Sequence, residues 1–191
     1  MKIKDNLKDG YEILKGNNIF SYKLDCEILM SQTLNISREE VLLNLDKGIR
    51  EEEREKYLNL INRRKKKEPI AYITNNKYFW KDKFVTDKDV LIPRPDSEHL
   101  VEQTLRFIKK DQYKRILDVG VGSGCLSISI LKERPYCKFD AIDLSKNALK
   151  LAKINAKLHQ LSDRIKFYKK DVDNFYNDKY DLIISNPPYI I

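Results

Sequence analysis

Residues 115–124 read Arg-Ile-Leu-Asp-Val-Gly-Val-Gly-Ser-Gly, an apolar run that passes directly into three alternating glycines. This pattern predicts a buried strand that ends in a tight turn, because glycine adopts backbone angles that other residues avoid. In an open parallel sheet, ligands bind beyond the carboxyl ends of the strands. The stretch therefore predicts a strand of an α/β sheet together with one wall of a ligand site.

Strands and helices alternate along the chain on the C-terminal side of this stretch. The predicted strands cover 116–119, 139–143, 165–168 and 180–185, and the predicted helices cover 123–132 and 145–158. Such alternation is typical of a parallel α/β sheet with right-handed crossovers. We therefore expect a Rossmann-like domain, which we assign to residues 93–191.

The first part of the sequence has a different pattern. Residues 1–68 place apolar side chains at helical spacing, and Ser37 with Glu40 has the form of a capping box, so we expect a small helical bundle. The bundle has no catalytic constellation of its own, which leaves substrate docking or simple packing as its role. Residues 69–92 follow as a linker with a hairpin, whose strands are predicted at 78–80 and 84–86 around a turn at 81–83.

A segment with two prolines, Pro93-Arg94-Pro95-Asp96-Ser97, opens the α/β domain. The prolines keep the chain extended, and either Asp96 or Ser97 is expected to cap the helix that follows. Arg94 is held between rigid neighbours, where its guanidinium faces either a substrate or a structural carboxylate.

Composition limits the classes of function. The chain has 191 residues, 41% of them hydrophobic and 35% charged, as in globular proteins. No run approaches the roughly 20 apolar residues of a membrane span, and the start shows no secretory signal, so no membrane partner and a cytoplasmic location are expected. Three cysteines without CxxC spacing predict neither a disulfide framework nor a metal site. The net charge of +8 suits nucleic acid only weakly, because lysine is frequent throughout.

The glycine turn favours a nucleoside ligand. Gly120-Val121-Gly122-Ser123-Gly124 is G-x-G-x-G, which differs from the dinucleotide fingerprint and offers bare backbone to an uncharged ligand. Asp143 ends the next predicted strand, where a carboxylate can accept hydrogen bonds from both ribose hydroxyls, a role favoured over capping the helix that starts near Ser145. Asp171 and Val172 follow the third strand and are expected to contact an adenine. Asp118 either orients the loop or meets the amino acid end of the ligand.

The last predicted strand leads into Asn186-Pro187-Pro188-Tyr189. Two prolines make this turn rigid and remove two N–H donors, so carbonyl oxygens are presented to a ligand. The Asn186 side-chain oxygen and the Pro187 carbonyl oxygen would hold the two N–H groups of an amide or aryl amine, and Tyr189 would pack on its plane. The nitrogen then attacks a sulfonium methyl group in line, and positioning supplies most of the catalysis.

Several stretches taken together resemble the HemK/PrmC family of S-adenosylmethionine-dependent methyltransferases, which modify the glutamine of the Gly-Gly-Gln motif in peptide chain release factors. The likeness rests on residues 68–73, 79–80, 91–98, 120–124, 141–143 and 185–190. It implies a class I methyltransferase sheet in which residues 120–124, Asp143, Asp171, Val172 and Asn186 contact the cofactor. It also implies that residues 186–189 hold the glutamine.

The sequence departs from the family at two points. Asn75 stands where the family usually has glycine, and because asparagine tolerates positive φ, the turn is expected to persist. Family members also continue past Asn-Pro-Pro-Tyr with strands that complete the sheet, whereas this sequence ends at Ile191. We therefore expect a sheet incomplete at its C-terminal side, from a fragment or a truncated gene product.

Three functions remain open at this point. The first is methylation of the glutamine side-chain amide of a release factor. The second is methylation of the exocyclic amine of a nucleic-acid base, which the same turn would hold once the base is flipped out. The third is binding of a release factor or cofactor without turnover.

Overall fold

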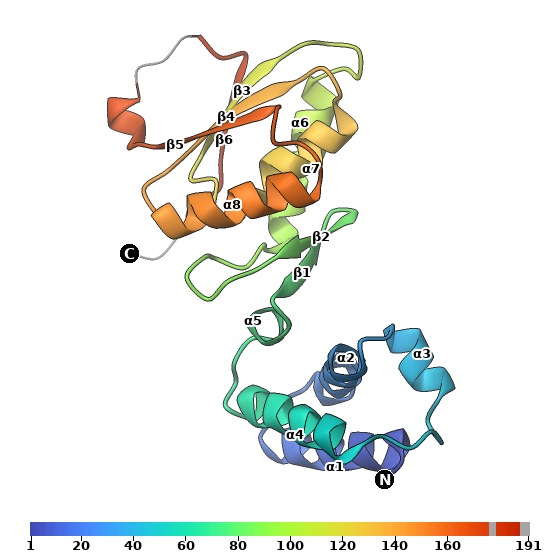
Figure 1. The fold of residues 1–191 in the computed structure, drawn as a ribbon. Helices are drawn as coiled ribbons and strands as arrows, with labels where there is room; N and C mark the ends of the chain where they lie inside the picture. The colour runs from blue at the N-terminus through green and yellow to red at the C-terminus, as the bar shows by residue number, and fades with distance from the viewer. Residues whose placement is uncertain (176–178, 188–191) are drawn as a thin grey trace. The chain divides into compact units, whose positions relative to one another are not determined.

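The computed structural model describes residues 1–175 and 179–187, and the chain divides into two compact units, Met1–Thr74 and Asn75–Ile191 (Figure 1). The first unit consists of helices and the second contains the sheet. The sequence-based boundaries at residues 68 and 92 stay predictions, whereas the division by contacts falls between Thr74 and Asn75. The described part of the chain contains no helix long and apolar enough to cross a membrane.

The helical unit is built around α2 (Tyr22–Leu34), which packs against α1 (Ile3–Gly16), α3 (Arg38–Leu43) and α4 (Glu51–Lys65). A short helix, α5 (Ile70–Thr74), completes it, and its Ile73 joins the same apolar core. The predicted capping box is confirmed, because the Ser37 side chain accepts from the Glu40 N–H and the Glu40 carboxylate accepts from the Ser37 N–H. The predicted helical bundle is therefore confirmed.

The second unit contains a parallel sheet with the strand order β5-β4-β3-β6. Its strands are β3 (Arg115–Val119), β4 (Lys138–Asp143), β5 (Ile165–Lys169) and β6 (Leu182–Ser185). Its helices are α6 (Glu98–Phe107), α7 (Cys125–Glu133) and α8 (Lys146–Leu158), with short 3₁₀ turns at Pro95–Ser97 and Val172–Asn174. The predicted alternation of strand and helix, and with it the α/β fold class, is confirmed.

β6 begins two residues later than the sequence predicts, at Leu182. The two residues before it are committed to side-chain contacts. The Tyr180 hydroxyl donates to the buried carboxylate of Asp140 at 2.8 Å, and the Asp181 carboxylate accepts from the Arg115 N–H at 2.8 Å. These two bonds fix where β6 joins β3.

A hairpin packs on this unit rather than standing apart from it. Its strands are β1 (Asn76–Phe79) and β2 (Asp82–Val85), and Phe79 and Phe84 are buried in the core of the sheet domain. Asn75, immediately before β1, has φ of 55°, so asparagine does adopt the positive φ expected of it. The hairpin thereby extends the core of the second unit.

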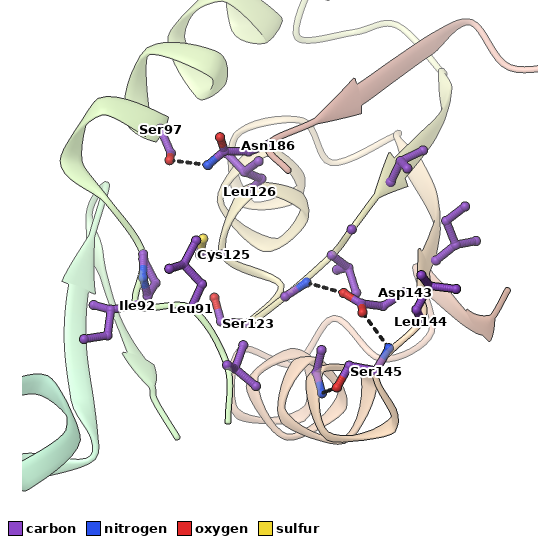
Figure 2. A pocket seen from close by; sticks show the side chains of 18 of the residues that line it. Leu91, Ile92, Ser97, Ser123, Cys125, Leu126, Asp143, Leu144, Ser145 and Asn186 are labelled. Atoms are coloured by element: carbon purple, nitrogen blue, oxygen red, sulfur yellow. Dashed lines mark hydrogen bonds between the residues drawn. The ribbon is translucent and has the colours of Figure 1, made fainter. Parts of the chain in front are cut away.

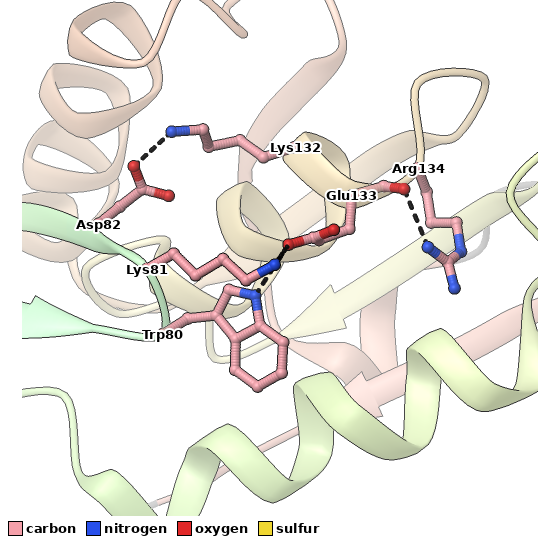
Figure 3. Close-up of polar contacts among 6 residues, drawn as sticks. All are labelled: Trp80, Lys81, Asp82, Lys132, Glu133 and Arg134. Atoms are coloured by element: carbon pink, nitrogen blue, oxygen red, sulfur yellow. Dashed lines mark hydrogen bonds and ion pairs between the residues drawn. The ribbon is translucent and has the colours of Figure 1, made fainter.

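The turn of this hairpin is Trp80-Lys81, so the predicted turn at 81–83 is wrong. Contacts outside the hairpin explain the difference. The Trp80 backbone N–H donates to the Glu98 carboxylate at 2.7 Å, and its indole N–H donates to Glu133 at 3.2 Å. Figure 3 shows Lys81 on the same Glu133 carboxylate and Asp82 paired with Lys132. Side chains of α6 and α7 therefore hold the turn at Trp80-Lys81, a position that the local sequence does not predict.

A single buried amide joins the hairpin, α8 and the glycine turn. Asn155 on α8 is fully buried; its Oδ1 accepts from the Val85 N–H at 2.8 Å, and its Nδ2 donates to the Val85 carbonyl at 3.1 Å. The same Nδ2 also donates to the Ser123 carbonyl at 2.8 Å. Buried backbone groups need hydrogen-bond partners. The Asn155 amide supplies to the Val85 backbone of β2 the two bonds that a neighbouring strand would otherwise supply.

We predict that Asn155→Ala lowers the free energy of unfolding of the second unit by about 3 kcal/mol, because it leaves buried backbone groups unpaired. Calorimetry of the full chain measures the shift of that unit's transition. Asn147→Ala is the matched control, since Asn147 is exposed on the same helix and its side chain donates to the exposed Asp89 at 2.9 Å. Equal shifts in the two variants would contradict this role of Asn155.

Candidate functional site

A cavity of about 410 Å³ lies at the carboxyl ends of the strands (Figure 2). Its volume falls in the range of roughly 300–1,000 Å³ that is usual for small-molecule sites. It is lined by residues 89–94, Ser97, 119–123, Cys125, Leu126, 142–145, Ala148, 170–172 and Asn186. The glycine turn and the Asn186 turn therefore face one shared space.

The glycine turn forms the floor of this cavity. Gly120, Gly122 and Gly124 have φ of 76°, 55° and 80°, angles at which other residues are strained. The Gly120 and Val121 N–H groups donate to the Ile142 carbonyl at 2.9 and 3.0 Å, which ties the turn to β4. A Cβ on Gly120 would meet nothing within 4 Å, so the backbone there is open to a ligand.

Gly124 has a different surrounding from the other two glycines. A Cβ at this position would lie 3.3 Å from the Cβ of Ala152 on α8 and 3.2 Å from Ile128. Glycine here allows α7 and α8 to approach each other. The structure thus places Gly120, Val121, Gly122 and Ser123 in the cavity lining and Gly124 against α8.

Asp143 links the turn to the start of α8. Its Oδ2 accepts from the Gly122 N–H at 3.0 Å and its Oδ1 accepts from the Ser145 N–H at 2.8 Å, as Figure 2 shows. The Ser145 hydroxyl in turn caps α8 by accepting from the Ala148 N–H at 3.2 Å. A carboxylate oxygen has two lone pairs, so each oxygen of Asp143 can still accept a bond from a ligand hydroxyl.

Asp171 and Val172 lie at the side of the cavity, after β5. The Asp171 carboxylate accepts from the Asp173 N–H at 3.1 Å, which fixes a short 3₁₀ turn. Val172 is 50% exposed, so an apolar surface is available there. Lys170, which the sequence analysis did not select, lines the same side.

Asn186 follows β6 directly and lies beside the glycine turn. In the pairing of β3 with β6, Val119 is opposite Ser185, so Gly120 and Asn186 leave neighbouring strands together. The Ser185 hydroxyl donates to the Val119 carbonyl at 2.9 Å and strengthens this junction. Pro187 is exposed, and the predicted residues Pro188 and Tyr189 lie outside the described residues.

The sequence does not predict the contact that Ser97 makes with Asn186. We expected Asp96 or Ser97 to cap the following helix, but the Ser97 side chain makes no capping bond. Its hydroxyl instead accepts from Asn186 Nδ2 at 2.6 Å. Local sequence could not reveal this bond, because its two partners lie 89 residues apart.

Arg94 also lines the cavity, and its side chain is exposed. The sequence allows two partners for Arg94, a substrate or a structural carboxylate. Within the part of the chain that the structure describes, the Arg94 side chain makes no ion pair, so the structural carboxylate is not found there. The two prolines place this guanidinium at the wall of the cavity.

Asp118 lies beneath the glycine turn and outside the cavity lining. It is buried, and the Ser127 hydroxyl donates to its Oδ2, while its Oδ1 has no hydrogen-bond partner among the described residues. Burial raises the pKa of the Asp118 carboxyl to about 6, and the nearby Asp143 charge acts in the same direction. Of the two roles considered, its geometry favours orienting the loop, since it joins β3 to α7.

We predict that the Asp118 carboxyl makes stability depend on pH. Between about pH 4 and pH 6 the unfolded chain releases this proton while the folded chain keeps it, so the free energy of unfolding falls as pH rises. Asp118→Asn keeps an acceptor for Ser127 without this titration, and should gain about 3 kcal/mol relative to the parent chain across that window. Thermal unfolding from pH 4 to 7 measures the difference in the free energy of unfolding. The same dependence on pH in both chains would contradict the raised pKa of Asp118.

Both units of the chain match models of known protein families. Residues 97–190 match the family model of the methyltransferase small domain, and residues 5–74 match that of the PrmC N-terminal domain. With the parallel sheet and its glycine turn, these matches define a Rossmann-like methyltransferase that carries a helical N-terminal domain.

Three relatives identify the family more closely. The release factor glutamine methyltransferase of Clostridium acetobutylicum is 40% identical over 195 residues, and that of Clostridium botulinum is 43% identical over 196 residues. Each alignment covers 100% of this chain and 68% of the relative. The Coxiella burnetii protein of the same name is 38% identical over 168 residues, 88% of this chain and 61% of that protein. The chain belongs to the release factor glutamine methyltransferase family, as its resemblance to HemK/PrmC proteins implied.

Proposed function

We propose that this chain transfers the methyl group of S-adenosylmethionine to the side-chain amide nitrogen of the glutamine in the Gly-Gly-Gln motif of peptide chain release factors, in the cytoplasm. One observation carries the proposal. The glycine turn and Asn186 leave neighbouring strands and line the same cavity. A methyl donor bound at the glycine turn and a methyl acceptor bound at Asn186 would therefore meet in this cavity.

The residues present fit S-adenosylmethionine. The cavity has the volume of a small-molecule site, and the turn at Gly120 offers backbone without a side chain between it and a ligand. Asp143 is the carboxylate we assign to the ribose hydroxyls, and Asp171 with Val172 we assign to the adenine. When bound, S-adenosylmethionine supplies a methyl group on a positively charged sulfur.

The part of the site that would bind the glutamine amide depends on hydrogen-bond acceptors rather than on a catalytic base. The Asn186 Oδ1 and the Pro187 carbonyl would accept the two N–H groups of the glutamine amide, and Tyr189 would pack on its plane. In the proposed transfer the amide nitrogen would form a bond to the methyl carbon, the carbon–sulfur bond would break with its electrons retained by sulfur, and the nitrogen would lose a proton to water. Because an amide nitrogen is a weak nucleophile, orientation toward the methyl group supplies most of the rate.

The test is transfer of label from methyl-labelled S-adenosylmethionine to purified release factor or to nucleic acid. We expect label in the release factor, on glutamine of the Gly-Gly-Gln motif. Label in nucleic acid would favour methylation of a base amine, and label in neither would leave a chain that binds without turnover.

We predict that Asn186→Ala lowers the rate of transfer by at least about 100-fold, since removing one preorganised polar group from a reaction site typically costs this much. Its dissociation constant for S-adenosylmethionine, measured by calorimetry, should change by less than about threefold, because Asp143 and the glycine turn are intact. Transfer at the parental rate would remove the proposed role of Asn186.

We predict that Asp143→Ala weakens S-adenosylmethionine binding by about 30-fold, because the carboxylate is lost as an acceptor for the ribose and no longer holds the Gly122 N–H. Isothermal titration calorimetry measures this, with circular dichroism to confirm folding. Asp163→Ala, an exposed carboxylate outside the cavity lining, is the control and should bind as the parent chain does. The same loss in both variants would contradict the assignment.

A further inference from the structure

We propose that a groove formed by α8 and β5 binds single-stranded nucleic acid, through its phosphates and the face of a base. The two elements pack against each other in the second unit (Figure 1). The groove has a volume of about 550 Å³, and lysines and apolar side chains line it. We call it the lysine groove, after its cationic residues Lys146, Lys150, Lys153, Lys157 and Lys169.

The charge of this surface has one sign. The four lysines of α8 recur at intervals of three and four residues, so they share one face of the helix. Residues 146–169 contain seven of the 37 Lys and Arg residues of the chain but only one of its 29 Asp and Glu residues. Outside this segment the two signs are nearly equal in number. A general abundance of lysine therefore does not explain the imbalance.

The lysines of the groove are exposed and form no ion pair with any residue that the structure describes. The cations at the end of α4 differ in this respect, because Arg63 pairs with Glu68 and Arg64 pairs with Asp25. Like charges three and four residues apart on a helix repel each other and destabilise it. A bound polyanion would relieve this repulsion along α8.

Apolar side chains share the groove with the lysines. Leu149 is buried, Ile154 is 45% exposed, and Phe167 is half-buried on β5. Proteins that bind single strands combine a cationic groove with aromatic side chains on which bases stack. An acidic peptide could meet the same lysines, but only a nucleobase offers a plane for the Phe167 ring at each step along the chain of anions. The combination favours nucleic acid.

The spacing of the lysines also fits an extended polyanion. From Lys146 to Lys157 the helix rises about 16 Å, so the cations form a line rather than a point site. β5 is the edge strand of the described sheet, and lysines on an edge strand commonly serve to prevent pairing with another sheet. That role accounts for the lysines of β5 but not for the four on α8.

The groove is a neighbour of the cavity but separate from it. Ser145 and Lys170 line the cavity, whereas the adjacent Lys146 and Lys169 line the groove. Among the described residues, none lines both. Nucleic acid in the groove would therefore be a bound partner and not the methyl acceptor, and the inference goes beyond the proposed function.

The experiment measures binding of a fluorescently labelled oligouridylate of about 12 nucleotides to the full chain by fluorescence anisotropy. We expect a dissociation constant in the micromolar range that rises between about 50 and 200 mM salt. The triple variant Lys150→Gln, Lys153→Gln and Lys157→Gln should raise it by at least about tenfold. It should also reduce the slope of log affinity against log salt by about 2. An unchanged dissociation constant in this variant would overturn the proposal.

A second triple variant controls for net charge. Lys65→Gln, Lys66→Gln and Lys67→Gln remove the same charge from exposed positions of the helical unit, in the densest basic run of the sequence. Its dissociation constant should stay within about twofold of the parental value. An equal loss in the two triple variants would assign binding to overall charge and overturn the lysine groove as the site.

The contribution of the aromatic ring is tested by Phe167→Leu, which keeps an apolar side chain. We expect the dissociation constant to rise about fivefold with the salt slope unchanged, because stacking is lost and the phosphate contacts remain. Parental affinity in a variant that circular dichroism shows to be folded would overturn the stacking.

Two competitors distinguish other occupants, and neither measurement needs methyl transfer. Polyglutamate of equal charge should compete weakly; competition as strong as that of unlabelled oligouridylate would indicate an acidic protein segment and overturn nucleic acid as the partner. Saturating S-adenosylmethionine should not displace the probe, because the cavity and the groove have separate linings. Displacement would place the nucleic acid in the cavity and overturn the proposal.

Discussion

The parallel pairing of β3 with β6 is the interaction on which the site depends. It sets Val119 opposite Ser185, and the next residue on each strand belongs to one of the two functional turns. A shift of this register by one residue would turn the side chains of β6 to the opposite face. The contacts of Tyr180 with Asp140 and of Asp181 with the Arg115 N–H fix the start of β6, so they also fix the position of Asn186.

Three polar side chains, from β3, β4 and α8, hold the glycine turn in place. Asp118 ties β3 to α7 through Ser127, Asp143 holds the Gly122 N–H, and Asn155 holds the Ser123 carbonyl. Asp118, Ser127, Asn155 and Ser123 are buried, so loss of the bond between Asp118 and Ser127 or between Asn155 and Ser123 would leave a buried polar group without that partner, which is costly. These bonds hold the floor of the cavity in place, and catalysis by positioning depends on such a fixed geometry.

Much of the fold and of the candidate site could be predicted, because the signals are local. The glycines at 120, 122 and 124, the carboxylate at 143 and the turn at 186 each follow an apolar strand, and strand ends gather at one edge of a parallel sheet. The predicted position of the hairpin turn is wrong because Glu98 and Glu133, which hold Trp80, are remote from it in sequence. The position of Ser97 just before a helix predicts a capping bond, which the structure does not show.

The sequence alone determined the order of helices and strands, the glycine turn and the proline turn, because hydrophobic periodicity and the restricted backbones of glycine and proline act within a few residues. The tertiary structure alone decided which polar groups meet. It directed the Ser97 hydroxyl to Asn186 and the Asn155 amide to Val85 and Ser123. A hydrogen bond between residues that are distant in sequence depends on how the helices and strands pack, and no local sequence pattern encodes that packing.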